Sequence, residues 1–121
     1  MGEGFGIPLL LRYLLETCTT VPECRAVLLR VPVHMSYNVT LLDAHGDFLT
    51  AYLAPDRAPV LRAWPCATNH QGRVEWPAHA EVTGTVEREA FLAARLADPT
   101  EDCERLVDRF AEEPLFWKGY A

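Results

Sequence analysis

The sequence is poor in serine and in positive charge, and each shortage narrows what the protein can do. Ser36 is the single serine. It lies outside the G-x-S-x-G pattern that exposes a serine nucleophile on a sharp turn, so we expect no serine hydrolase. Eleven basic residues stand against seventeen acidic ones, for a net charge of −6. Proteins that bind nucleic acid concentrate lysine and arginine on one face, so we expect no nucleic-acid partner.

Cysteine pairs and long apolar runs are also scarce. The 121 residues contain four cysteines and no C-x-x-C motif, which is too few for a disulfide scaffold. The apolar stretch 7–15 is too short to span a bilayer, and no basic region typical of a signal peptide precedes it. These features predict a cytoplasmic protein with reduced thiols and no membrane partner. The length predicts a single domain over residues 1–121.

The first third of the chain carries helix signals. Residues 2–6 are rich in glycine and are expected to form a flexible loop. A proline and a 3.6-residue apolar stripe then predict a helix that ends near Cys18. Thr20 and Glu23 have the spacing of a capping box, which predicts a second helix reaching about Arg30.

The middle of the chain carries strand signals. Residues 37–42 and 48–53 are β-branched and aromatic, and the glycine-containing stretch 43–47 between them predicts a hairpin turn. Residues 60–64 predict a third strand, and residues 66–69 predict either a short fourth strand or a continuation of the third after Pro65. Together they predict an antiparallel meander.

The last third returns to helix signals after a polar stretch. Residues 70–84 are predicted to form a loop. Thr85 can cap a helix over residues 86–97, and Thr100 can cap another over residues 101–112. The order α-α-β-meander-α-α predicts an α+β fold with an antiparallel sheet.

Three side chains, Cys66, His70 and His79, are candidates for a zinc site in the polar loop. A structural zinc normally takes four ligands, often as two close pairs, and no partner for His79 is apparent. We therefore favour a buried cysteine and two loop histidines, and we expect no metal and no other cofactor.

None of the cysteines has the setting of a nucleophile. A nucleophilic cysteine needs a helix N-terminus or a neighbouring cation to favour its thiolate. Cys103 lies near a helix start but has acidic neighbours, and Cys18 and Cys24 fall on apolar helix faces. The sequence therefore contains no complete catalytic constellation.

One polar cluster stands out at residues 67–71, Ala-Thr-Asn-His-Gln. It follows a predicted strand, and strand ends can hold side chains rigidly over a cleft. A neutral asparagine such as Asn69 can donate an amide hydrogen to a developing oxyanion. An asparagine in such a place more often caps or turns the chain, so the residues alone favour that simpler role.

Five segments that cover nearly the whole chain carry a resemblance to a known family: residues 5–18, 31–41, 52–57, 67–71 and 88–92. They resemble, in order, segments of the C45 family of autoproteolytic cysteine acyltransferases and hydrolases. These N-terminal-nucleophile enzymes are related to isopenicillin-N acyltransferase and, more distantly, to the bile-salt hydrolases.

The resemblance implies a fold, a chemistry and two site residues. The fold is an αββα sandwich, of which this chain resembles the C-terminal portion. The chemistry is attack on a linear C–N amide bond by a cysteine that becomes the first residue after self-cleavage, with its own α-amino group as general base. The resemblance places Asn69 in the oxyanion hole and His70, from the same motif, in the substrate-binding wall.

The chain departs from the family pattern because its nucleophile has no counterpart here. We therefore expect a fragment that contributes the oxyanion-hole side and a substrate wall. Its partners would be a small-molecule amide or acyl donor and a separate nucleophile-bearing half. The alternative is a free-standing, non-catalytic α+β module that homodimerises through exposed sheet edges and the aromatic segment 115–120.

Overall fold

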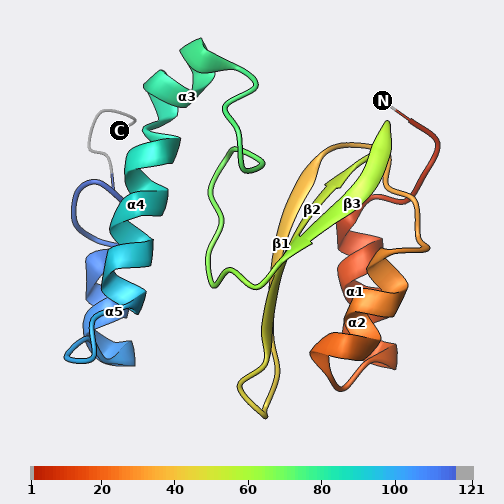
Figure 1. Cartoon of the computed structure of the whole chain (residues 1–121), viewed down its shortest axis with the longest axis horizontal. Helices are drawn as coiled ribbons and strands as arrows, with labels where there is room; N and C mark the ends of the chain where they lie inside the picture. The colour runs from red at the N-terminus through yellow and green to blue at the C-terminus, as the bar shows by residue number, and fades with distance from the viewer. Residues whose placement is uncertain (1, 117–121) are drawn as a thin grey trace. The chain divides into compact units, whose positions relative to one another are not determined.

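The computed structural model describes residues 2–116, and within them five helices accompany one antiparallel sheet (Figure 1). This combination of helices and an antiparallel sheet confirms the α+β class. The elements in chain order are α1 (Ile7–Thr17), α2 (Val21–Leu28), β1 (Tyr37–Leu42), β2 (Phe48–Ala54), β3 (Arg57–Arg62), α3 (Pro77–Thr83), α4 (Thr85–Leu96) and α5 (Cys103–Arg109).

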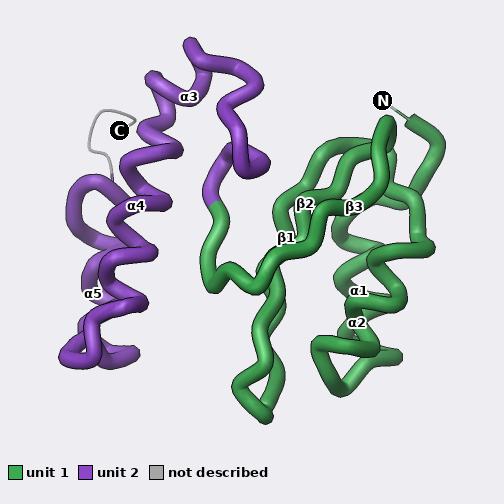
Figure 2. The backbone as a smooth tube through the Cα atoms, viewed as in Figure 1, with its two compact units in different colours: residues 1–67 green, residues 68–121 purple. Residues whose placement is uncertain are grey.

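The chain divides into two compact units, Met1–Ala67 and Thr68–Ala121 (Figure 2). The first unit holds α1, α2 and the sheet, and the second holds α3, α4 and α5. The single domain and the αββα sandwich stay predictions. No helix among the described residues has both the length and the apolar character needed to cross a membrane.

The two helices of the N-terminal unit begin and end close to where the sequence predicts. Cys18 is the C-cap of α1. The capping box at α2 is formed, with the Glu23 amide donating to the Thr20 hydroxyl and the Glu23 carboxylate accepting from the Thr20 amide. The α2 helix ends at Leu28 rather than near Arg30.

The opening segment is held in place, which corrects the expectation of a flexible loop. Phe5 forms a parallel bridge with Val33, and its amide donates to the Pro32 carbonyl at 2.9 Å. Gly4 lies so close to this backbone that a Cβ there would approach the Val33 carbonyl carbon to 2.5 Å. A residue with a side chain cannot occupy this position without moving the main chain.

The core of the N-terminal unit is built from leucines and small aliphatic residues of α1, α2, the sheet and the segment between α2 and β1. Each large aliphatic side chain removed from water contributes about 1.5–3 kcal/mol, so this cluster holds the two helices against the strands. Its buried members are Leu10, Leu14, Val27, Leu28, Val33, Val39, Ala51 and Leu53.

The sheet has the order β1-β2-β3, and both pairings are antiparallel. The third strand begins earlier than predicted because residues 55–56 make a tight connection and Ala54 pairs with Arg57. Pro59 is accommodated because β3 is an edge strand. The backbone groups on the outer edge of such a strand have no neighbouring strand to bond to. Residues 66–69 do not form the predicted fourth strand.

The C-terminal unit contains a helix where the sequence predicts a loop. Residues 77–83 form α3, because Pro77 takes a first-turn position where its missing N–H costs nothing. Gly84, with φ of +56°, ends α3 and also precedes α4. That left-handed backbone is accessible to glycine with little strain, so this residue allows one helix to follow the other directly.

Two of the predicted helix caps are wrong. Gly84, not Thr85, is the N-cap of α4, because the Thr85 hydroxyl is engaged elsewhere. At α5 the cap is Asp102, whose carboxylate accepts from the Arg105 amide at 2.8 Å. Thr100 instead bonds to the carboxylate of Asp98.

The homodimer alternative stays a prediction. It relies in part on the aromatic segment 115–120, and residues 117–120 of that segment lie outside the described residues. The two sheet edges it needs are the outer strands β1 and β3.

Candidate functional site

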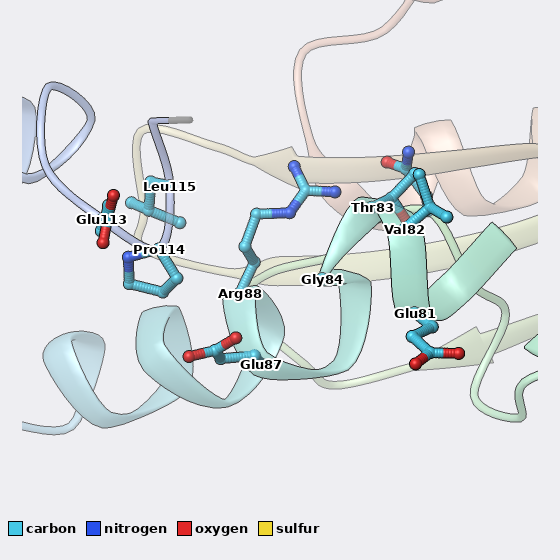
Figure 3. Close-up of a pocket in the computed structure, with 10 residues that line it drawn as sticks. Glu81, Val82, Thr83, Gly84, Glu87, Arg88, Glu113, Pro114 and Leu115 are labelled. Atoms are coloured by element: carbon cyan, nitrogen blue, oxygen red, sulfur yellow. The ribbon is translucent and has the colours of Figure 1, made fainter. Parts of the chain in front are cut away.

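The C-terminal unit contains a cavity of about 650 Å³ (Figure 3). Asn69 is one of the residues that line it. The end of α3, the first turn of α4 and residues 113–115 form the rest of the lining. The volume falls within the range of small-molecule sites in proteins. The asparagine singled out in the sequence therefore borders a space that can hold a ligand.

A buried threonine of α4 fixes the backbone at this asparagine. Thr85 is 1% exposed, and its hydroxyl accepts from the Asn69 amide at 2.7 Å. The same hydroxyl donates to Thr68 at 2.8 Å, and the Thr68 hydroxyl in turn donates to the Thr85 carbonyl at 2.8 Å. These bonds fasten residues 68–69 to the start of α4.

His70 continues this attachment. Its Nδ1 lies 3.1 Å from the Thr85 hydroxyl, and its Nε2 lies 3.2 Å from the Glu89 carboxylate, one turn further along α4. Both side chains are mostly buried, with 13% of His70 and 17% of Glu89 exposed. The ring thus bridges the segment to the helix, and His70 does not belong to the lining of the cavity.

These bonds hold the main chain of Asn69 in place and leave its side chain available to bind a ligand. Its amide nitrogen is held by a hydroxyl inside the protein, while the residue as a whole is exposed. Preorganised donors stabilise developing charge well because they need not reorganise during the reaction. An amide carried on such a backbone is suited to that task.

None of the four cysteines forms a disulfide within the described residues, and none is placed as an activated nucleophile. Burial, together with the neighbouring Cys18, raises the pKa of Cys24 to about 11, which keeps that thiol protonated near neutral pH. Cys66 is buried, and Cys103 is exposed at the start of α5 beside Asp102. Thiolate is the reactive form of cysteine.

The three side chains considered for zinc, Cys66, His70 and His79, do not form a metal-binding group in the described part of the chain. No group of three or more histidine, cysteine and carboxylate side chains within residues 2–116 could hold a metal ion. His79 instead stacks on Trp76, with ring centroids 5.0 Å apart. His70 faces Thr85 and Glu89.

Sequence reasoning missed Thr85 and Glu89 as parts of the site. The sequence favours a helix cap at Thr85, and Glu89 lies within the segment 88–92 that carries part of the family resemblance. Both residues lie far from residues 68–70 in the sequence. Only the folded chain brings Thr85 and Glu89 into contact with that segment. The one signal in the sequence is that residues 67–71 and residues 88–92 both belong to the segments that resemble the same family.

A protein-family comparison adds to this geometry. The family model described as AAT, acyl-coenzyme A:6-aminopenicillanic acid acyl-transferase, matches residues 1–115. Neither a curated protein nor a solved structure matches the chain.

Proposed function

Because the chain belongs to the acyl-coenzyme A:6-aminopenicillanic acid acyl-transferase family, we propose that it forms the oxyanion-hole side of an acyl-transfer site. The nucleophile of this site would be a cysteine outside the 121 residues, as in the N-terminal-nucleophile enzymes of the C45 family. The observation that carries the proposal is the position of Asn69, on a cavity wall and anchored through its backbone to Thr85.

The external nucleophile follows from the state of the four thiols in this chain. Cys24 is kept protonated, Cys66 is buried, and Cys18 closes the end of α1. Among the described residues, no cation lies beside Cys103 to favour its thiolate form. Cys103 also directly follows Asp102, whose carboxylate disfavours a second negative charge nearby. A reactive cysteine must therefore come from another segment of polypeptide.

The reaction would proceed through a thioester. The α-amino group of the external cysteine takes the thiol proton, and the sulfur attacks the carbonyl carbon of the acyl donor. The C–S bond forms while the carbonyl electron pair moves to oxygen, which accepts a hydrogen bond from the Asn69 side-chain amide. When the C=O bond re-forms, the C–N bond breaks, and the leaving amine takes the proton held by the α-amino group.

A second nucleophile completes the cycle. An amine or a water molecule attacks the thioester carbonyl and passes its proton to the α-amino group, and the thiol is regenerated when the C–S bond breaks. Attack by an amine gives acyl transfer, and attack by water gives hydrolysis. Asn69 would serve both steps, because each passes through a tetrahedral oxyanion.

His70 has a supporting place in this proposal. Its ring bridges Thr85 and Glu89, so it holds the wall on which the substrate would rest. Loss of this bridge would loosen the segment that carries Asn69, and displacements of about 1 Å can cost orders of magnitude in rate.

The experiment that tests the proposal begins with the DNA upstream of the Met1 codon. We expect it to encode a cysteine-led half in frame or in an adjacent gene. The two halves, produced together, should cleave a simple amide and form a thioester on that cysteine, detected as an added acyl mass. Upstream DNA with unrelated sequence, or co-folded halves that form no thioester, would refute the proposal.

A further inference from the structure

Two thiols meet where α1 passes into α2 (Figure 1). Cys18 is the C-cap of α1, and its backbone amide donates to the Leu14 carbonyl at 2.9 Å. Cys24 lies near the start of α2, and its amide donates to the Thr20 carbonyl at 3.1 Å. Both side chains are partly buried against the same hydrophobic core, and the two thiols are hydrogen-bond neighbours. The fold therefore brings these two sulfur atoms together.

The turn between the two cysteines is held by hydrogen bonds. The Glu23 carboxylate accepts from the amides of Thr19 and Thr20 at 2.7 and 3.2 Å, and from the Thr19 hydroxyl at 3.1 Å. Glu23 and Thr19 are the direct sequence neighbours of the two cysteines, so these bonds fix the two cysteine backbones relative to each other. A disulfide requires a specific approach of two backbones, and a turn that already holds both favours its closure.

We propose that Cys18 and Cys24 form a reversible disulfide by exchange with a small disulfide such as oxidised glutathione. The pair is a redox-modification site of the N-terminal unit. This role goes beyond the proposed function, because it requires neither an acyl donor nor the external cysteine.

The exchange has two steps. In the first, the Cys18 thiolate attacks one sulfur of oxidised glutathione. A mixed disulfide forms, the glutathione S–S bond breaks, and the departing glutathione thiolate takes up the proton released by Cys18. In the second, the Cys24 thiol releases its proton, its sulfur attacks the Cys18 sulfur, and the second glutathione leaves as a thiolate that takes up that proton. The chain loses two electrons and two protons, and one oxidised glutathione becomes two reduced molecules.

The order of attack follows from the hydrogen bonds at the two sulfur atoms. Burial and the neighbouring Cys18 raise the pKa of Cys24 to about 11, so Cys24 keeps its proton and donates it to the Cys18 sulfur. The Thr17 hydroxyl lies 3.6 Å from the same sulfur and can also donate to it. Hydrogen bonds to a charged group favour its charged form, so Cys18 is the attacking thiol. Exchange between ordinary thiols and disulfides takes seconds to hours, so it does not require the activated cysteine of an acyl-transfer site.

A redox titration of the 121-residue chain tests the proposal, with mixtures of reduced and oxidised glutathione as the probe. Trypsin cleaves after Arg12 and Arg25, so one peptide, residues 13–25, contains both cysteines. We expect this peptide to lose the mass of two hydrogens as oxidised glutathione increases. Cys103, exposed in the C-terminal unit, should take up glutathione instead.

The same titration in concentrated urea measures the contribution of the fold. We expect the equilibrium constant for the internal disulfide to be about tenfold or more larger in the folded chain, because the folded turn raises the effective concentration of one thiol at the other. An equal constant in the unfolded chain would show that the structure does not favour the pair.

Two variants separate the roles of the two thiols. Cys24→Ser removes the second thiol, so Cys18 should accumulate as a stable glutathione adduct. In Cys18→Ser, the adduct at Cys24 should form about tenfold or more slowly than the adduct at Cys18 in Cys24→Ser, because thiolate is the attacking form. Dispersed amide NMR spectra would establish that both variants are folded.

Three outcomes would overturn the proposal. They are glutathione adducts at both cysteines of the folded wild type without the internal disulfide, equal equilibrium constants in buffer and in urea, and faster adduct formation at Cys24 than at Cys18. None of them involves an acyl donor or a thioester. A failure here is therefore distinguishable from a failure of the proposed function.

Discussion

The backbone amide of Asn69 donates a 2.7 Å hydrogen bond to the hydroxyl of Thr85, sixteen residues further along the chain. This bond joins the segment that follows the sheet to the first turn of α4. The hydroxyl also donates to Thr68, so one buried side chain determines where the candidate oxyanion donor lies. Replacement of that hydroxyl should therefore affect both stability and the site.

The Thr85→Val variant keeps the shape of the side chain and removes the hydroxyl. The amide of Asn69 and the hydroxyl of Thr68 then lose a buried partner, which costs about 1–3 kcal/mol of unfolding free energy. Urea denaturation of the chain measures this loss. Thr85→Ser, the control, retains the hydroxyl and should recover most of it, and equal destabilisation by both variants would show that the hydroxyl has no role.

Gly4→Ala tests the attachment of the opening segment. The new Cβ would lie 2.5 Å from the carbonyl carbon of Val33 and 2.8 Å from that of Pro32, backbone atoms that cannot rotate away. We expect a loss of about 1–3 kcal/mol, typical of overpacking.

Gly6→Ala is the matched control for that change. The nearest atom to its Cβ is 3.6 Å away, on the His34 ring, and its φ is −69°. Its stability should lie within about 0.5 kcal/mol of the wild type. Equal thermal midpoints for Gly4→Ala and the wild type would disprove the close approach.

Asp43 gives the N-terminal unit an acid-sensitive contact. Its carboxylate accepts from the backbone amides of Val21, His45 and Asp47, and the first of these bonds does most to lower the pKa of Asp43 below its ordinary 3.8. A lowered pKa in the folded state means that this stabilisation is complete above about pH 4. It is lost as the pH falls through the lowered pKa.

The Asp43→Asn variant should therefore be less stable than the wild type at pH 7, and the difference should shrink as the pH falls below 3.8. Urea midpoints for the two proteins between pH 7 and pH 2.5 measure this convergence. A difference that stays constant over the whole range would contradict the assigned contact.

The cysteines should react with iodoacetamide in an order set by exposure and thiolate content. Cys103 is exposed and should be labelled first at pH 8, while Cys66 is buried and should be protected. Cys24, whose pKa is raised to about 11, should react slowly. Peptide mass spectrometry over time reads out the order, and fastest labelling of Cys24 would point to a nucleophile within this chain.

Local signals were enough to predict most of the N-terminal unit. The capping box at Thr20 and Glu23 and the strands around the turn at residues 43–47 depend on residues close in sequence, and the structure has both. Such features are fixed by backbone preferences and nearby hydrogen bonds. They can be inferred from the sequence without knowledge of the tertiary fold.

The errors arise where tertiary contacts override local preference. Thr85 has the type and position of a helix cap, yet its hydroxyl bonds to Thr68 and accepts from Asn69, so Gly84 precedes the helix instead. The same contacts hold residues 68–69 away from a fourth strand. Asn69 could be named from a sequence motif, whereas its position on the wall of a cavity emerges only from the tertiary structure.

The most direct test of the central claim is the effect of Asn69→Ala on acyl transfer by the chain combined with its cysteine-bearing half. Loss of one oxyanion donor should lower kcat about a hundredfold or more with a small change in KM. Gln71→Ala, two residues away in the same segment, serves as the control and should keep nearly full activity. If Asn69→Ala retains the wild-type kcat in a folded enzyme, Asn69 does not stabilise the oxyanion and the account is wrong.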